Sequence, residues 1–525
     1  MVRFTFKLGL FSFFSISLVY YLASCKKPNP NPNPTPPVNT KAVYQDTLLN
    51  ISRETYYWNE NIPKTFNPLS YQVYIAATDS SPLTEAIKLF SPLNPANKLH
   101  YDHFSFLLTT AEYNSLFVTG ATKRFGMNFS QDRNGIWRVA YVAHASPAYS
   151  MGIRRGFQLN SVNGNTLSAT TSSSQLSVID NILQYNSTAS FVFTPTGSTS
   201  SLTLQINQGN FGDDECIATK VVKSGTKVIG YIAYNTFLTQ FSNTQGALHP
   251  GLDTAFSGLA AKGITDLIID LRYNGGGYTS VAEQMDNAMI PLSQDGQIMY
   301  SETFNDSLNI YHKAFPKEGF PGDTTIYISK TNPDNPAALS LNNIVFIVSN
   351  ETTSAAELLI NNLYPYFTNL KLVGLGKSYP QTQQNTGGKP FGYAGAQPIP
   401  LNNPIYYSFL INFESKNSLG QDNYVSGFVP NVQVYDGLEY NWGDPNEDGY
   451  KAAFNYLSTG SFSVNSSGNF LSLGRNATTS SPNARYFMKL RDSKSFYGMI
   501  KTPVKGKKFS SLTYKLNKAK FSLHY

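Results

Sequence analysis

The spacing of hydrophobic residues changes along the chain, and each change predicts a different kind of structure. Between residues 41 and 110, apolar positions recur at helical spacing. Between about 112 and 208 they form short β-like runs broken by Gly, Ser and Asn turns. Between about 209 and 458, strand-like and helix-like stretches alternate. We therefore expect a multidomain α/β protein: a small N-terminal helical domain (41–110), a β-rich module (112–208) and an α/β layered core (209–458).

Local patterns predict single elements within these units. In the N-terminal domain the helical positions are Tyr44, Leu48, Ile51, Thr55 and Trp58, and a second short helix is expected over Pro82–Phe90. The strands expected in the β-rich module are Trp137–Val142, Ala189–Phe193 and Leu202–Ile206.

In the α/β core, strands are expected over Val228–Asn235, Ile264–Leu271 and Asn343–Ser349. Helices are expected around Leu252–Leu259 and Val281–Met289, and from Ala355 onward. Active sites in such sheets tend to lie where strands end and helices begin, so motifs at these junctions are the first candidates for chemistry.

The N-terminus has the features of an export signal. Arg3 and Lys7 precede an apolar stretch, Leu8–Tyr21, that is too short for a comfortable transmembrane helix. Leu22-Ala23-Ser24-Cys25 resembles a lipobox, which implies cleavage after residue 24 and a lipid on Cys25. A plain signal peptide and an uncleaved anchor remain alternatives. The Pro-rich segment that completes 25–40 favours an extended spacer between the lipid and the folded part.

Composition narrows the class of protein. The chain has 525 residues, of which 41% are hydrophobic and 14% charged, enough to bury the cores of several domains. With only two cysteines, lipidation of Cys25 leaves Cys216 without a disulfide partner. The net charge of +7 falls to +5 when Arg3 and Lys7 are removed with the signal (+7 − 2), which gives little support for nucleic-acid binding.

Positive charge is concentrated in the C-terminal extension, 459–525. Ten Lys and Arg residues lie between 489 and 520, and the single acid of the extension is Asp492. Aromatic and aliphatic residues are interleaved with them, so we expect a small β appendage there. Its basic face is either simply solvated or attracted to anionic lipid.

A serine lies at one of the strand–helix junctions. The segment Val348–Leu359 runs from an apolar strand into a helix, which places Ser354 at the helix N-terminus. Free backbone N–H groups and the helix dipole at such a position suit an oxyanion in acyl transfer. Ser354 and Glu357 also have the spacing of a capping box, which would merely satisfy the first helical turn.

A glycine-rich motif, Asp270-Leu271-Arg272-Tyr273-Asn274-Gly275-Gly276-Gly277, follows another apolar strand. Together with the Ser354 segment it resembles the S41 serine peptidases, the C-terminal processing protease family. The similarity continues in Asp102–Phe106, Ser426–Pro430 and Gly443–Pro445, in the order of the family. The resemblance implies that Ser354 is the nucleophile and that the amides of Ala355 and of one glycine, taken as Gly276, form the oxyanion hole.

In this family the general base is a lysine, and the segment that best matches its Gly-Lys motif is Gly387–Gly392, which assigns the base to Lys389. The interval from the nucleophile is 389 − 354 = 35 residues, which requires an insertion around Ser378–Asn385. Lys377 is the rival. Tyr393 stands where well-studied members have a Gln that orients the lysine.

The β-rich module resembles a PDZ domain. Ala145–Ala148, followed by Gly152, Gly156 and Val162-Asn163-Gly164, matches the PDZ pattern, although Phe157 stands where an Asp is common. Phe125-Gly126-Met127 would then be the loop that receives a peptide C-terminus, beside a strand edge that pairs with the peptide. A generic small β-domain is the alternative.

No cofactor is expected. Asp444–Gly449 imitates the start of an EF-hand loop, but its twelfth position would be Asn455 rather than the required Glu, so we interpret it as a helix start. We find no His/Cys metal spacing and no phosphate-binding glycine loop.

These observations favour a serine endopeptidase of the cell envelope that uses a Ser/Lys pair on unfolded or C-terminally recognised polypeptides. It would be anchored by the lipid on Cys25, on the outer membrane facing the periplasm. The main alternative is a catalytically inactive lipoprotein that binds peptides in the PDZ-like groove. A carbohydrate-binding lipoprotein rests only on the abundance of Tyr and Asn.

Overall fold

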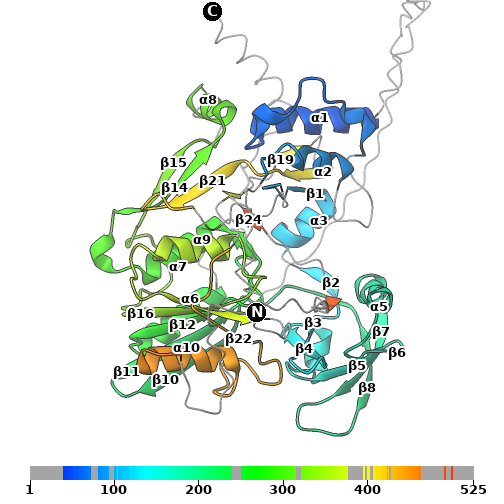
Figure 1. Ribbon diagram of the computed structural model, residues 1–525, viewed down its shortest axis with the longest axis vertical. Coiled ribbons are helices and arrows are strands. Elements are labelled where there is room, and N and C mark those ends of the chain that lie inside the picture. Colours follow the sequence, from blue (N-terminus) through cyan, green and yellow to red (C-terminus); the bar gives the residue numbers. More distant parts are fainter. Residues whose placement is uncertain are drawn as a thin grey trace, which may run out of the picture.

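The structure is a computed structural model (Figure 1). It describes residues 40–72, 81–93, 100–102, 105–119, 121–238, 250–314, 321–376, 394–395, 399–401, 406–422, 424, 427–462, 490–491 and 498–500. The predicted export signal, Cys25 and the Pro-rich spacer lie outside these residues. None of the helices in the described ranges is long and apolar enough to cross a membrane.

The N-terminal unit is helical, as expected, but it is completed by residues from much later in the chain. Its helices are α1 (Thr40–Thr55), α2 (Pro82–Lys88) and α3 (Thr110–Tyr113). Strand β1 (Phe106–Thr109) pairs antiparallel with β20 (Tyr406–Phe409), which pairs with β19 (Ile399–Leu401). Leu48, Ile51 and Leu83 share one hydrophobic core with Leu410 and Tyr424.

The β-rich module is an antiparallel sheet with two helices, and the three predicted strands are confirmed. The strands of its sheet are β3 (Met127–Gln131), β4 (Trp137–Val142), β5 (Gln158–Val162), β7 (Thr188–Thr194) and β8 (Leu202–Asn207), in that order, with β6 (Asn165–Thr166) paired to β5. Its helices are α4 (Pro147–Ser150) and α5 (Ser173–Tyr185), and β2 (Thr122–Arg124) pairs with β9 (Gly209–Phe211) at its ends. Trp137, Ile179 and Phe191 fill its own core.

The α/β core is built on a six-stranded sheet in the order β10 (Cys216–Ser224), β11 (Lys227–Tyr234), β12 (Asp266–Asp270), β16 (Asn343–Val348), β17 (Lys371–Gly376) and β22 (Val432–Tyr435). β10 is antiparallel to β11 and the other pairs are parallel. Alternate residues of each strand point to opposite faces of the sheet. In β12, Leu267 and Ile269 pack in the cluster with α6 (Pro250–Ala261), α7 (Thr279–Met289) and α9 (Ala355–Leu363), whereas Ile268 packs with α10 (Asp448–Thr459).

A second sheet extends the core towards the N-terminal unit. Its order is β15 (Thr324–Tyr327), β14 (Ile298–Phe304), β21 (Phe413–Asn417) and β18 (Ala394–Gly395), and α8 (Asp306–Ala314) follows β14. Figure 1 shows the N-terminal unit and the β-rich module on different sides of this core.

The C-terminal extension does contain strands, but those described join sheets of other units. β23 (Leu490–Arg491) pairs with β3, and β24 (Gly498–Ile500) pairs with β13 (Gly276–Tyr278).

Candidate active site

The two motifs singled out in the sequence meet at the carboxyl ends of neighbouring parallel strands. β12 and β16 are paired, with Asp270 opposite Ile347. The loop after β16 is tied to the loop after β12 by side-chain hydrogen bonds: Thr352 Oγ1 donates to the Leu271 carbonyl at 2.8 Å, and Thr353 Oγ1 to that of Gly275 at 3.0 Å. The chain that leads to Ser354 is thus positioned by the glycine-rich motif.

Ser354 has a backbone conformation that is rare for a residue with a side chain. Its φ of 64° and ψ of −119° lie in a region that favours glycine, directly before the first residue of α9. The residue is 4% exposed, and its Oγ has no hydrogen-bond partner among the residues the structure describes. A strained turn that places an unbonded hydroxyl at a helix N-terminus is typical of a nucleophile.

The capping-box interpretation holds on the Glu357 side. Glu357 is fully buried, and its Oε2 accepts a hydrogen bond of 3.0 Å from the Ser354 N–H. Glu357 therefore fixes the backbone of the turn at Ser354, in the arrangement of a capping box.

The amides predicted for the oxyanion hole lie on either side of this turn. Ala355 is the first residue of α9, so its N–H has no acceptor within the helix. The Gly276 N–H donates to Asn274 Oδ1 at 2.9 Å, and Asn274 Nδ2 in turn donates to the Tyr234 carbonyl. To bind an oxyanion, Gly276 would have to share or leave its bond to Asn274, a constraint that the sequence did not reveal.

Gly277 is required by its surroundings. Its φ is 139°, and a Cβ on it would lie 2.4 Å from the carbonyl carbon of Phe237. Phe237 hydrogen-bonds to the residues on both sides, accepting from the Tyr278 N–H and donating to the Gly276 carbonyl. β13 is thus held against the chain that follows β11.

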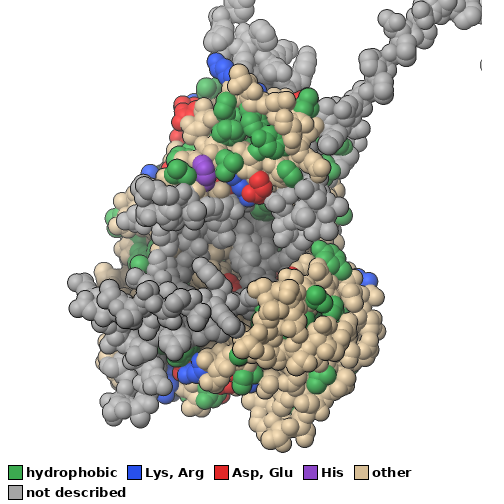
Figure 2. Space-filling model, turned by 45° about the vertical axis from the view of Figure 1, so that its right-hand side comes forward, with side chains coloured by type: hydrophobic (Ala, Val, Ile, Leu, Met, Phe, Trp, Pro, Cys, Tyr) green, Lys and Arg blue, Asp and Glu red, His purple; other side chains and the backbone are tan. Residues whose placement is uncertain are grey.

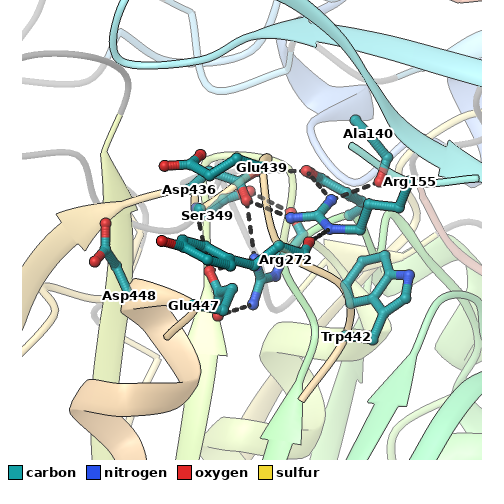
Figure 3. A network of polar contacts seen from close by, with 12 residues as sticks. Ala140, Arg155, Arg272, Ser349, Asp436, Glu439, Trp442, Glu447 and Asp448 are labelled. Carbon is teal, nitrogen blue, oxygen red and sulfur yellow. Dashed lines mark hydrogen bonds and ion pairs between the residues drawn. The ribbon is translucent and has the colours of Figure 1, made fainter. Parts of the chain in front are cut away.

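A buried network of charged side chains is centred on Arg272, in the loop after β12 (Figure 3). The Arg272 guanidinium donates to Asp270, Asp436 and Glu447, with its Nη1 and Nη2 each 2.9 Å from a Glu447 oxygen. Glu447 also caps α10 by accepting from the Tyr450 N–H. The motif after β12 is thereby joined to the start of the last core helix.

Arg155 brings the β-rich module into the same network. Its Nη2 lies 2.9 Å from Asp436 Oδ1, and its Nε donates to the Tyr440 carbonyl. The Trp442 ring lies against both guanidiniums, 4.5 Å from Arg155 and 5.2 Å from Arg272 (Figure 3). Arg155, Asp436 and Trp442 were not expected from the sequence, because an Asp-Leu-Arg motif does not show which distant carboxylates meet its arginine.

The network sets the ionisation of its carboxyl groups. Burial raises the pKa of Asp436, but Arg155 and Arg272 outweigh burial, so the pKa lies below its ordinary value. The pKa of Glu447 is lowered in the same way, mainly by Arg272. For Asp270, burial prevails over Arg272 and the pKa is raised.

The residues predicted to receive a peptide C-terminus lie directly before and at the start of β3. Phe125 is buried and packs edge-on against Phe191, and Met127 is buried in the same core. Gly126 has a φ of 96°, and a Cβ on it would lie 2.0 Å from Ser146 Cβ, so the bend requires glycine. Whether this loop binds a carboxylate remains a prediction.

Several predicted residues fall outside the described part of the chain, including Lys389, Lys377, Tyr393 and Ser426. Of the Asp102 motif, Asp102 and Ser105 are described: Ser105 donates to Asp102 and accepts from the Ile411 N–H, which supports a structural role. In the part of the chain that is described, no group of three or more His, Cys, Asp or Glu side chains could hold a metal ion.

Residues 228–374, which include both motifs and Ser354, match the model of Peptidase family S41. These residues of the core are thus similar to peptidase family S41, a family of serine peptidases, and Ser354 stands at the turn between β16 and α9. Among curated proteins none matches the chain.

Several solved structures are similar to this chain. A candidate S41 protease from Bacteroides fragilis NCTC 9343 is 19% identical, with a TM-score of 0.59, covering 78% of this chain and 97% of that one. The photosystem II D1 C-terminal processing protease is 18% identical, with a TM-score of 0.40 and coverage of 75% and 92%. Mature CPAF is 11% identical, with a TM-score of 0.40 and coverage of 79% and 95%. The first of these shows the fold.

Proposed function

We propose that this protein is a cell-envelope endopeptidase in which Ser354 attacks the peptide bond and Lys389 accepts its proton. The observation that carries the proposal is the strained elbow at Ser354, whose buried Oγ has no hydrogen-bond partner among the described residues. Strain of this kind costs about 1–3 kcal/mol and persists only where the surroundings enforce it, which is common at active sites.

The chemistry follows from the arrangement. Ser354 Oγ adds to the peptide carbonyl as its proton passes to the neutral lysine amine. The Ala355 N–H, at the positive end of α9, and the Gly276 N–H would stabilise the negative oxygen. The lysine then protonates the leaving amine. Water attacks the acyl-enzyme, gives a proton to the lysine, and the carboxylic product leaves as Ser354 regains its hydrogen.

Two lysines are candidates for the general base, Lys389 and Lys377. β17 pairs with β16, the strand that leads to Ser354, and it ends at Gly376. Lys377 follows that strand directly in sequence, whereas Lys389 lies twelve residues further on and has the better motif. Both therefore enter the test.

The substrates we propose are unfolded polypeptides or polypeptides recognised by their C-termini. The β-rich module supports this part of the proposal, because β3 begins directly after the Phe125-Gly126 bend. Attachment through a lipid on Cys25, at the outer membrane facing the periplasm, rests on the sequence of the N-terminus alone.

The test is degradation of casein by the full-length chain in detergent. Ser354→Ala and Lys389→Ala should each lower kcat by at least about 10³-fold, whereas Lys377→Ala and the surface variant Lys416→Ala should retain activity. Loss of activity in Lys377→Ala but not in Lys389→Ala would move the base to Lys377. A wild-type chain that binds peptides but never cleaves them would favour the inactive peptide-binding lipoprotein.

A further inference from the structure

The C-terminal extension contributes a short strand to each of two separate sheets. β23 pairs antiparallel with β3 in the β-rich module, with Leu490 opposite Phe129 and Arg491 opposite Asn128. β24 pairs parallel with β13 in the core, from Gly498 opposite Gly276 to Ile500 opposite Tyr278. In Figure 1 both strands are red, β24 in the middle of the molecule and β23 beside β3.

The first strand occupies a peptide-binding position. Without β23, β3 would be the edge of the sheet β3-β4-β5-β7-β8. β23 also lies against α5, so it fills the groove between the edge strand β3 and helix α5. An extended peptide bound in that space, by main-chain hydrogen bonds to the edge, is the β-addition mode of peptide recognition.

The second strand occupies the edge of β13, the strand that begins at Gly276 and contacts α9. Gly277 is paired with Phe237 on one side and with Met499 on the other. β24 also contacts α9, the helix that begins directly after Ser354. Without β24, the outer edge of β13 would be open. An extended polypeptide that paired with this edge would lie along Gly276, whose amide is assigned to the oxyanion hole.

The two positions are close enough to be occupied by one polypeptide. Six residues, 492–497, separate β23 from β24. Seven Cα–Cα steps span at most about 25 Å, so the groove and the β13 edge lie within that reach. The direction is also fixed, because the segment in the groove precedes the segment at β13 in the chain.

Charge does not explain why the extension binds the module. Residues 158–208, which supply most of its sheet and α5, contain a single charged side chain, Asp180. On the face turned towards the viewer in Figure 2, this part of the molecule shows few charged side chains. Main-chain pairing, which is tolerant of sequence, therefore accounts for the binding of this basic segment better than electrostatic attraction.

We propose that the C-terminal extension is a built-in competitor of the substrate, occupying the groove at β3 and the β13 edge at the same time. The inference rests on the proposed function, since it concerns regulation of the same Ser354 site. A polypeptide substrate takes the same two edges in the same direction after displacing the extension. The extension thereby keeps the peptidase inactive towards weakly bound polypeptides.

The experiment uses the full-length chain and proline pairs, because proline lacks the N–H that strand pairing needs. The variants are Leu490→Pro/Arg491→Pro in β23 and Met499→Pro/Ile500→Pro in β24. Thr479→Pro/Ser480→Pro, in the extension but outside both strands, is the matched control. Amide hydrogen exchange is measured over residues 127–131 and at Gly277, because the Gly276 and Tyr278 amides are bonded to Asn274 and Phe237 instead, and the rate of casein cleavage is measured with it.

Each strand variant should lose exchange protection at the edge that it covers, while β12 and β16 remain protected and the control is unchanged. Cleavage by Met499→Pro/Ile500→Pro should rise about tenfold, the factor expected if about one molecule in ten is open in the wild type. A synthetic peptide of residues 486–503 should reverse that rise competitively.

The exchange measurement separates this inference from the proposed function. Unchanged protection in both strand variants would overturn the inference whatever the activity. Lost protection with no rise in cleavage, in an enzyme that cleaves casein, would overturn it as well. Lost protection in a chain that is inert throughout would leave the extension as the occupant of both edges and would refute the proposed peptidase instead.

Discussion

Arg272 and Glu447 are 175 positions apart in the sequence and are joined by two hydrogen bonds of 2.9 Å each. Both side chains are almost fully buried. The pair connects the loop after β12, which positions the chain before Ser354, with the N-terminus of α10, so this loop is supported by a fully paired charge.

Removing the Arg272 charge should therefore be costly. Arg272→Met leaves Asp270 and Glu447 buried without a cation, which should lower the free energy of unfolding by about 3–5 kcal/mol. Lys416→Met removes a lysine that pairs with Asp422 at the surface and should cost less than about 1 kcal/mol. Urea unfolding of both variants tests this, and equal losses would contradict the role given to the network.

The cost should depend on pH. Asp436 and Glu447 have lowered pKa values in the folded state, so they stabilise the fold above their ordinary pKa and lose that contribution as the pH falls through the folded value. The difference between wild type and Arg272→Met should be largest near neutral pH and shrink below about pH 4. A difference that is constant with pH would point to lost packing alone.

Asp286 should have the opposite pH dependence. It is fully buried in α7 and accepts from Asn362, and burial holds its pKa well above the ordinary value. The folded state then binds more protons than the unfolded chain, so this group lowers stability as the pH rises from the ordinary pKa to the raised one. Asp286→Asn should therefore stabilise the protein at about pH 8 and much less near pH 4, by about 1.4 kcal/mol for each pKa unit removed.

Thermal unfolding at several pH values measures this effect. Asp46→Asn, which makes the same change at an exposed position of α1, should leave stability nearly unchanged at every pH. An Asp286→Asn variant that is destabilised throughout would show that the carboxylate is needed in its charged form.

Cys216 should be unreactive in the folded protein. Burial raises the pKa of its thiol to about 12, so almost none is thiolate near neutral pH. In a Cys25→Ser chain, Cys216 is the one cysteine, and it should react with iodoacetamide far more slowly at about pH 8 than in concentrated urea. Equal rates in both conditions would contradict the raised pKa of the thiol.

The strained backbone of Ser354 should lower the stability of the protein, so a substitution that relieves the strain should raise stability while it abolishes activity. Ser354→Gly should relieve the unfavourable φ and raise stability relative to Ser354→Ala, by about 1 kcal/mol after the entropy cost of glycine. Both variants should be inactive, and circular dichroism and thermal unfolding compare them. If the alanine variant is as stable as the glycine variant, the strain is absent in solution.

The sequence predicted the elements whose periodicity is local. Strand Trp137–Val142 matches β4, and the helix expected from Ala355 is α9, because alternating or helical hydrophobic spacing reflects which face is buried. The strand-end position of Ser354 and the Asp270–Gly277 motif followed from the same patterns, with the family resemblance supplying their roles.

What the sequence did not predict depends on contacts between distant segments. Arg155 and Asp436 meet across 281 positions, and no local pattern indicates such a partner. The hydrogen bond between Gly276 and Asn274 depends on a turn geometry that the glycine-rich motif leaves open. β24 was expected in a separate appendage, but edge pairing with β13 is set by the open edge of the core rather than by β24 itself.

The most direct test of the central claim is to acylate the nucleophile. The full-length chain is mixed with p-nitrophenyl acetate, the release of p-nitrophenol is followed, and the acetylated residue is located by peptide mass spectrometry. We predict a burst of about one equivalent and acetylation of Ser354, both absent in Ser354→Ala. The same burst in Ser354→Ala, or acetylation of another residue alone in the wild type, would contradict the assignment of Ser354 as the nucleophile.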